Sequence, residues 1–215
     1  MFLPIILVLS LLTGTGCAAM LVMATTNPDQ KVRDAYMLFD QQYRPLPAER
    51  LIREAIARYQ TRNDELGLAE AYRVYGFFFR SAALEKWQKF YESQGFYETN
   101  ATFSNRYEKS IEYFEKSAAL FEKHGTYDKL ANVYLNMGFT YEFANQKSQA
   151  CSAYKKSLIA SDRFMKDHPG DLLNLPEGYS TYKEYIDRCL EENGTCPHFS
   201  TLLPVSIWYV VRNYG

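Results

Sequence analysis

The sequence predicts an all-α fold in which paired helices stack into a curved array. Small, apolar and aromatic residues recur at offsets of three and four, which places them on one face of a helix. Similar groups of these residues return along the chain, and short turns containing Gly or Pro separate them. A single helix pair is too small to bury its own apolar face, so repeated pairs must pack on one another to make a core.

The clearest repeat lies in the second helices of two successive pairs. Each has a small residue, an apolar residue, an aromatic residue and another small residue at the same offsets. One copy comprises Tyr107, Ser110, Ile111, Phe114, Ser117 and Ala118, and the other comprises Lys147, Ala150, Cys151, Tyr154, Ser157 and Leu158. A weaker third copy comprises Ala48, Ile52, Ala55 and Ile56.

The helices that precede these also match one another. Tyr72, Tyr75, Gly76 and Phe79 align with Tyr134, Met137, Gly138 and Tyr141, and more weakly with Val32, Ala35, Tyr36 and Phe39. A Gly in a helix interior costs about 1 kcal/mol relative to Ala. We therefore expect Gly76 and Gly138 to lie where a neighbouring helix leaves no room for a Cβ atom.

The pattern also predicts where the helices begin and end. The expected ranges are 30–43, 47–62, 66–92, 105–124, 127–144 and 147–166, followed by an amphipathic capping helix within 178–192. Pro45 and Pro47 separate the first two helices, and His124 with Gly125 ends the fourth.

The repeated residues resemble the tetratricopeptide repeat family. Gly76 and Gly138 fit the family's Gly position, and Ala150 and Tyr154 fit its small and aromatic positions. The resemblance implies a helical-hairpin solenoid of about three repeats over residues 30–167, with an insertion at 81–104. A capping helix and an irregular tail would then occupy residues 168–215.

The resemblance further implies a concave groove that holds a peptide or a partner helix. Transferred onto this sequence, its lining is Arg33, Met37, Arg73, Phe77, Arg80, Asn132, Asn136, Phe139 and Phe143. Arginine suits recognition of carboxylates through its planar fork, and asparagine offers a peptide backbone both a donor and an acceptor. Alternatively, Phe139 and Phe143 pack against the tail or a neighbouring helix.

The insertion at 81–104 is rich in aromatic residues, including Trp87, Phe90 and Tyr91. One interpretation is a longer helix and a loop that pack on their own scaffold. The other is a protruding contact for a partner protein, because aromatic anchors dominate interface energies.

The N-terminus has an apolar run from Phe2 to Leu12, followed by small residues and Cys17. This order resembles the export signal of bacterial lipoproteins, which implies that Cys17 is the lipidation site. Residues 1–16 would be the signal peptide and 17–29 a linker. Cleavage after Ala24 and an uncleaved membrane helix are the alternatives. All three place the remaining chain outside the cytoplasm, anchored to or facing the bacterial periplasm.

Three further cysteines lie in the C-terminal part of the chain. Cys189 and Cys196 flank an Asn-Gly turn signal, so in an oxidising compartment they are expected to form a disulfide. The alternative is two thiols. Cys151 is expected to be a small buried apolar residue.

Charge and motifs exclude several classes of function. The chain has 24 Lys and Arg against 25 Asp and Glu, without the basic excess that nucleic-acid binding requires. It contains no zinc-protease spacing, phosphate loop or nucleophile elbow. We expect a protein-binding module that is not an enzyme and uses no metal or cofactor.

Exported lipoproteins of the resembled family suggest two roles. One is an inhibitor or immunity protein against a periplasm-acting, type VI-like effector toxin. The other is an assembly or localisation factor of a secretion or pilus machine. The short array, the insertion and the unusual tail favour one dedicated partner and hence the first role. An envelope enzyme with an unrecognised site is the alternative of another class.

Overall fold

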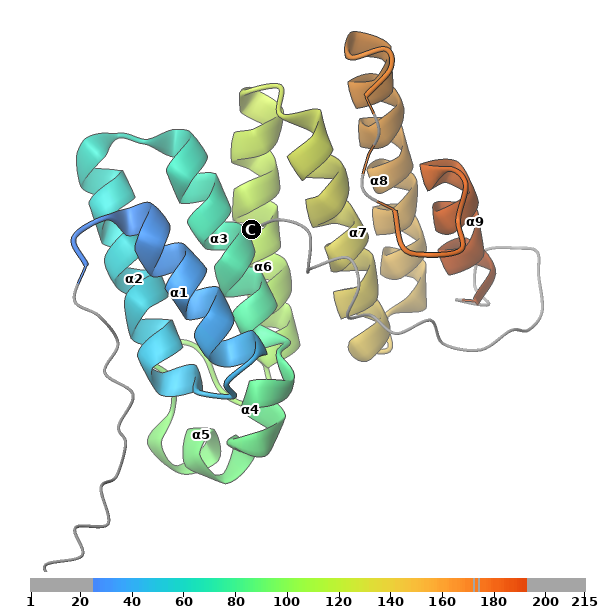
Figure 1. Ribbon diagram of the computed structural model, residues 1–215. Helices are drawn as coiled ribbons and strands as arrows, with labels where there is room; N and C mark the ends of the chain where they lie inside the picture. The colour runs from blue at the N-terminus through green and yellow to red at the C-terminus, as the bar shows by residue number, and fades with distance from the viewer. Residues whose placement is uncertain (1–24, 172, 174, 193–215) are drawn as a thin grey trace, which may run out of the picture.

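The fold is all-helical, as predicted (Figure 1). The computed structural model describes residues 25–171, 173 and 175–192. Within these residues the chain forms nine α-helices and no strand. They are α1 (Pro28–Asp40), α2 (Pro45–Arg62), α3 (Glu65–Phe79), α4 (Ala82–Lys86), α5 (Gln88–Gln94), α6 (Arg106–Lys123), α7 (Tyr127–Phe143), α8 (Lys147–Asp167) and α9 (Tyr182–Glu192).

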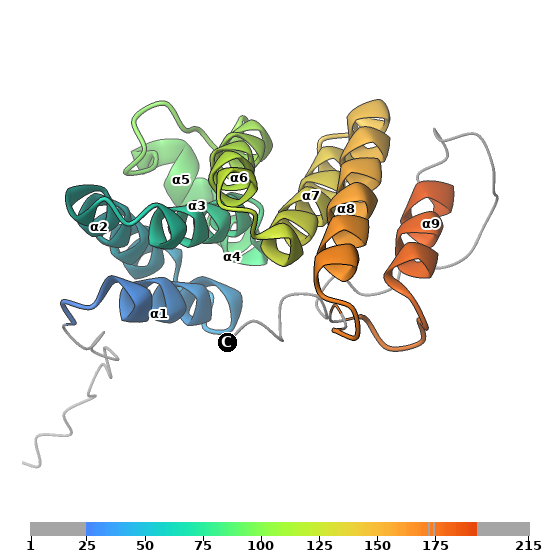
Figure 2. The ribbon, with the colours of Figure 1, turned by 90° about the horizontal axis from the view of Figure 1, so that it is seen from above.

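The long helices pack in chain order. The closest neighbours are the pairs α1 with α2, α3 with α6, and α7 with α8, and each pair also packs against the next. Figure 2 shows these pairs side by side, from α1 and α2 at one end to α9 at the other. Helix α1 additionally contacts α3, so first helices of successive pairs lie next to each other at this end.

Local sequence signals define the helix ends. The Asn27 side chain accepts a hydrogen bond from the Asp29 N–H, and Pro28 occupies the first turn of α1, where no amide donor is needed. Asn63 ends α2 in the left-handed region at φ 53°. Gly125 follows α6 at φ 67°, which confirms the predicted cap.

The two helical glycines lie against aromatic rings, as the sequence predicted. A Cβ atom added at Gly76 would lie 2.7 Å from the Phe114 ring, and one added at Gly138 would lie 2.2 Å from the Tyr154 ring. Both distances are far below van der Waals contact. The absence of a side chain at each Gly therefore lets the aromatic residue of the second helix reach the backbone of the first.

Serine hydroxyls fix the same register in both pairs. Ser117 Oγ donates to the carbonyl of Ala69 at 2.8 Å, and Ser157 Oγ donates to the carbonyl of Ala131 at 2.6 Å. Each acceptor lies seven residues before its helical Gly. The α3–α6 and α7–α8 pairs thus repeat one packing pattern.

The predicted helix at 66–92 is wrong, because α3 ends at Phe79 and two short helices follow. The chain turns back here, and the Trp87 indole N–H donates to the carbonyl of Tyr43 at 3.0 Å. Tyr91 is only 1% exposed, so its ring is part of the core. Folding back lets the insertion bury aromatic surface that a straight helix would leave in water.

Helix α9 covers the far end of the array. It packs on α8 and buries Tyr185 and Ile186 in a cluster with Tyr154. This agrees with the predicted capping helix. None of the helices in the described part is long and apolar enough to cross a membrane. The predicted signal peptide, Cys17 and the tail from 193 onward lie outside the described residues.

Candidate functional site

Side chains on α3 and α7 meet across a stripe of predicted groove residues. We call the set Arg33, Met37, Arg73, Phe77, Arg80, Asn132, Asn136, Phe139 and Phe143 the inner stripe. Arg73 Nη1 donates to Asn132 Oδ1 at 2.9 Å, and Arg80 Nη2 donates to Asn136 Oδ1 at 2.5 Å. The structure therefore brings together the arginines of one first helix and the asparagines of the next.

Arg73 is neutralised inside the protein. Its Nε donates to Glu70 Oε2 at 3.0 Å, and its Nη2 forms an ion pair with the other carboxylate oxygen. Burial raises the pKa of Glu70, but the attraction of Arg73 outweighs it and the net pKa is lowered. Arg73 is 5% exposed. The N–H donors of its guanidinium are thus already bonded within the protein, and the expectation that Arg73 would recognise a partner's carboxylate is not supported.

Arg80 has a different environment, although it lies only seven residues after Arg73, at the C-cap of α3. Its guanidinium lies over the rings of Phe77 and Phe114, at 5.1 and 5.9 Å from their centroids. Its Nε is buried without a hydrogen-bond partner. Among the described residues no carboxylate forms an ion pair with it. Burial lowers the pKa of Arg80 to about 10, because the charged form loses hydration.

The acid at the corresponding position of α1 is Asp40, which lies near the Tyr36 hydroxyl. Burial and, after it, the charge of Asp40 raise the pKa of Tyr36. The Tyr36 ring in turn packs edge-on against Phe77 at 6.2 Å. In the part of the chain that the structure describes, the neighbours of Arg80 are therefore aromatic rings and an amide rather than negative charges.

The aromatic residues of α7 divide between core and surface. Phe139 is 8% exposed and packs edge-on against Tyr154 at 5.7 Å. It therefore packs against the neighbouring helix α8, which was the alternative to lining the groove. Phe143 is 42% exposed and stacks on Tyr107 at 5.9 Å. Met37 on α1 is equally exposed. Met37 and Phe143 are thus the accessible apolar members of the inner stripe.

Arg33, the remaining member of the stripe, is exposed on α1. Its Nη2 donates to Gln30 Oε1 at 2.8 Å, one turn earlier on the same helix. It is thus a solvated cation at the edge of the stripe.

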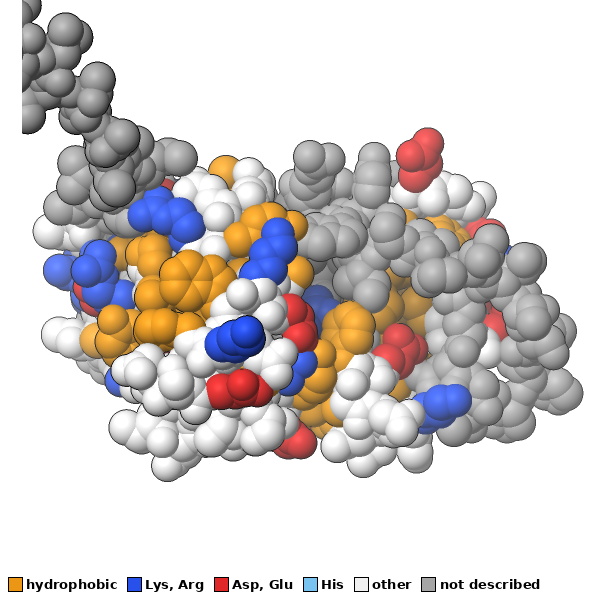
Figure 3. Space-filling view, turned by 90° about the horizontal axis from the view of Figure 1, so that it is seen from below, with side chains coloured by type: hydrophobic (Ala, Val, Ile, Leu, Met, Phe, Trp, Pro, Cys, Tyr) orange, Lys and Arg blue, Asp and Glu red, His pale blue; other side chains and the backbone are white. Residues whose placement is uncertain are grey.

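The aromatic insertion forms a second apolar surface, which Figure 3 shows at the end of the array that carries α4 and α5. Its half-buried side chains are Tyr43, Leu46, Trp87 and Phe90. The Lys86 ammonium lies 3.0 Å from the centroid of the Tyr43 ring. Trp87 and Phe90 retain an accessible edge here, whereas the buried Tyr91 is not available to a partner.

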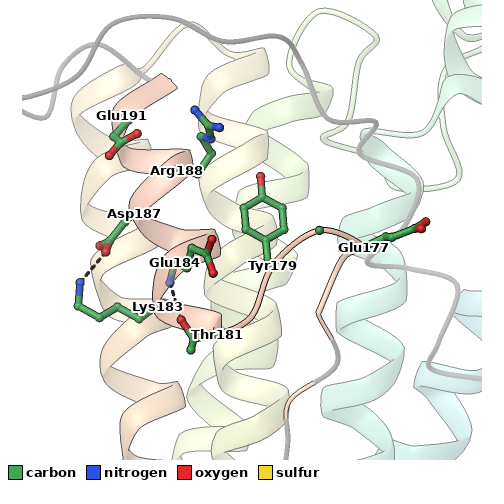
Figure 4. A pocket seen from close by; sticks show the side chains of 9 residues that line it. Glu177, Tyr179, Thr181, Lys183, Glu184, Asp187, Arg188 and Glu191 are labelled. Atoms are coloured by element: carbon green, nitrogen blue, oxygen red, sulfur yellow. Dashed lines mark hydrogen bonds and ion pairs between the residues drawn. The ribbon is translucent and has the colours of Figure 1, made fainter.

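A polar hollow lies beside α9 (Figure 4). Its walls come from α9 and the turn at 177–181, and they include the Lys183–Asp187 ion pair at 2.5 Å. The part of the chain described by the structure contains no group of three His, Cys, Asp or Glu that could hold a metal ion. The hollow therefore has no arrangement that indicates a specific chemistry.

The predicted Cys189–Cys196 disulfide is wrong at Cys189, which is a buried thiol. Cys189 packs in the buried cluster around Tyr154, between α9 and α8. Cys151 is buried as expected, but it is disulfide-bonded rather than a thiol. Cys17 and Cys196 lie outside the described residues.

A buried carboxylate, Glu49 on α2, was not predicted from the sequence. It is 0% exposed and accepts hydrogen bonds from the Tyr75 hydroxyl at 3.1 Å and the Glu98 N–H at 3.3 Å, while its Oε2 has no partner. Burial raises its pKa to about 7. Glu49 lies three residues before Ile52 on the apolar stripe of α2, and this position was the available signal.

Comparison with family models, with curated proteins and with solved structures finds no match for this chain.

Proposed function

We propose that this protein is a non-catalytic, protein-binding helical repeat protein of the bacterial envelope. The observation that carries the proposal is the inner stripe. It combines an arginine without a carboxylate partner among the described residues with two exposed apolar side chains, Met37 and Phe143. Such a mixture of apolar anchors and an arginine is typical of the energetic centres of protein interfaces.

The proposed architecture is a tetratricopeptide-like solenoid. The equal register of the α3–α6 and α7–α8 pairs supports it, since Gly76 and Gly138 receive Phe114 and Tyr154 in the same way. In such an array the first helices face one side together. The inner stripe would then line the concave side, where a polypeptide can contact several helices at once.

The proposed location is the periplasmic side of a membrane, with Cys17 as the lipid anchor. The apolar run from Phe2 to Leu12, followed by small residues and Cys17, supports export, because this order is typical of an export signal. Changing Cys17 to Ser is expected to move the protein from the membrane fraction to the soluble periplasmic fraction, because the lipidated residue is lost. Fractionation of cells followed by immunoblotting measures this, and a variant that stays with the membrane would contradict the lipid anchor.

The proposed role is that of an inhibitor or immunity protein for one periplasm-acting effector. A preformed site on packed helices loses little conformational freedom on binding, and this favours tight binding to a single partner. An immunity protein is expected to bind with nanomolar or lower Kd, about −12 kcal/mol or stronger. It should also block the toxic activity of its partner.

The test compares charge placed on the inner stripe with charge placed elsewhere. Met37→Asp with Phe143→Asp is expected to weaken binding of the partner captured from envelope extract by at least about tenfold. Ile159→Asp, at a residue 68% exposed on α8 outside the stripe, is the matched control and should bind as wild type does. Equal binding by both variants would contradict the proposal.

A further inference from the structure

The three arginines of the inner stripe differ in how their charge is balanced. Arg33 is solvent-exposed and bonded to Gln30, and Arg73 is paired with Glu70. Arg80 is half-buried, and its only hydrogen bond among the described residues goes to the neutral amide of Asn136. A cation that is partly removed from water and has no negative partner is energetically unfavourable. A ligand that supplies a negative charge would therefore stabilise it.

The surroundings of Arg80 limit which ligand groups can balance its charge. Phe77 and Phe114 lie against the guanidinium, and Tyr36 packs on Phe77, so the site is apolar except for the Asn136 amide. Planar, aromatic-flanked guanidinium groups bind carboxylates through paired N–H donors. An acidic side chain fits because its methylene stem can contact the rings while its charge meets the arginine.

We propose that Arg80 receives the carboxylate of an aspartate or glutamate side chain from an acidic segment of the protein partner. The proposal rests on the proposed function, which supplies the polypeptide, and it identifies the charge that this polypeptide must carry. Arg73 would then hold α3 and α7 together, while Arg80, at the C-cap of α3, would bind the acidic side chain of the partner.

The first test uses the full-length protein in detergent micelles and two small probes. N-acetylglutamate amide carries the acidic side chain alone, and N-acetylglutamine amide is its neutral match. The Nε–H signal of Arg80 in a ¹⁵N NMR spectrum is expected to shift and saturate with the acidic probe and to stay in place with the neutral one. Equal responses to the two probes would overturn the proposal.

The second test separates binding from a structural role. Arg80→Met should leave the melting temperature unchanged or raise it, because it removes a cation that lacks a negative partner among the described residues. Arg73→Met is the matched control and should lower the melting temperature, since it strands the Glu70 carboxylate. If Arg80→Met lowers the melting temperature as much as Arg73→Met, Arg80 is a structural residue and the proposal is wrong.

The partner itself provides the last comparison. Arg80→Met is expected to weaken its binding by at least about tenfold, mainly through faster dissociation. If the Met37/Phe143 variant loses the partner and Arg80→Met retains it, polypeptide binding stands and the carboxylate site is wrong. If Arg80 responds to the acidic probe but the Met37/Phe143 variant retains the partner, the carboxylate site stands and the proposed function is wrong.

Discussion

Replacing Gly138 by Ala is expected to destabilise the protein, although Ala is the better helix former by about 1 kcal/mol. The added Cβ would lie 2.2 Å from the Tyr154 ring, which is fully buried and cannot move aside. Overpacking costs roughly 1–3 kcal/mol, and a contact this close belongs at the upper end of that range. After the gain of about 1 kcal/mol in helix propensity is subtracted, we expect a net loss of about 2 kcal/mol in the free energy of unfolding. Denaturant unfolding followed by circular dichroism measures it.

A double-mutant cycle with Tyr154→Ala isolates the contact. Once the ring is removed, Gly138→Ala should become stabilising by up to about 1 kcal/mol, because only the helix propensity remains. The cycle of Gly76→Ala with Phe114→Ala should show the same reversal of sign. A Gly138→Ala effect that is the same with and without the Tyr154 ring would contradict the close packing of these two helices.

Removing the charge of Glu49 is expected to change how stability depends on pH. The carboxyl group has a pKa of about 7 in the folded protein against an ordinary value of 4.5, because burial disfavours the charged form. The folded state therefore holds its proton more tightly than the unfolded state. Its stabilising contribution is fully present below about pH 4.5 and is lost as the pH rises to about 7.

Glu49→Gln should abolish this loss. At 1.36 kcal/mol per pKa unit, the variant is expected to exceed wild type by about 3 kcal/mol above pH 7 and to match it near pH 4.5. The measurement is the free energy of unfolding of both proteins between pH 4.5 and 8. The control is Glu92→Gln, an exposed glutamate on α5, which should track wild type. Parallel curves for Glu49→Gln and wild type would show that Glu49 is not buried as described.

The paired helices could be predicted from sequence because their packing leaves a local signature. A Gly in a helix interior and an aromatic residue in the following helix can both be recognised in the sequence. The contact of Gly138 with Tyr154 confirms the close packing that they predict. The turn at Gly125 was predictable for the same reason, since its backbone conformation favours one residue type.

The path of the insertion could not be predicted in the same way. Its aromatic residues keep a helical spacing that fits both a long helix and a folded-back segment. The choice depends on distant contacts, such as the hydrogen bond from Trp87 to the carbonyl of Tyr43. The burial of Cys189 likewise depends on its packing against Tyr154 of α8, which is distant in the sequence.

The positions of the candidate site residues could be predicted from the sequence, but which arginine has an acidic partner could not. Arg73 and Arg80 are equivalent in the helical pattern, yet Glu70 neutralises only the first. The spacing of Glu70 and Arg73, three residues apart, was a visible signal for that pair. Among the described residues no carboxylate forms an ion pair with Arg80. This depends on where α1 and α7 place their side chains, and no local sequence pattern indicates it.

Binding of a partner polypeptide to the inner stripe is tested by the Kd of the purified partner for wild type, for Met37→Asp with Phe143→Asp, and for Ile159→Asp, by isothermal titration calorimetry. The first variant is expected to lose at least about tenfold in affinity, while the second binds as tightly as wild type. Unchanged affinity in the first variant, or a loss confined to Ile159→Asp, would contradict binding at the inner stripe.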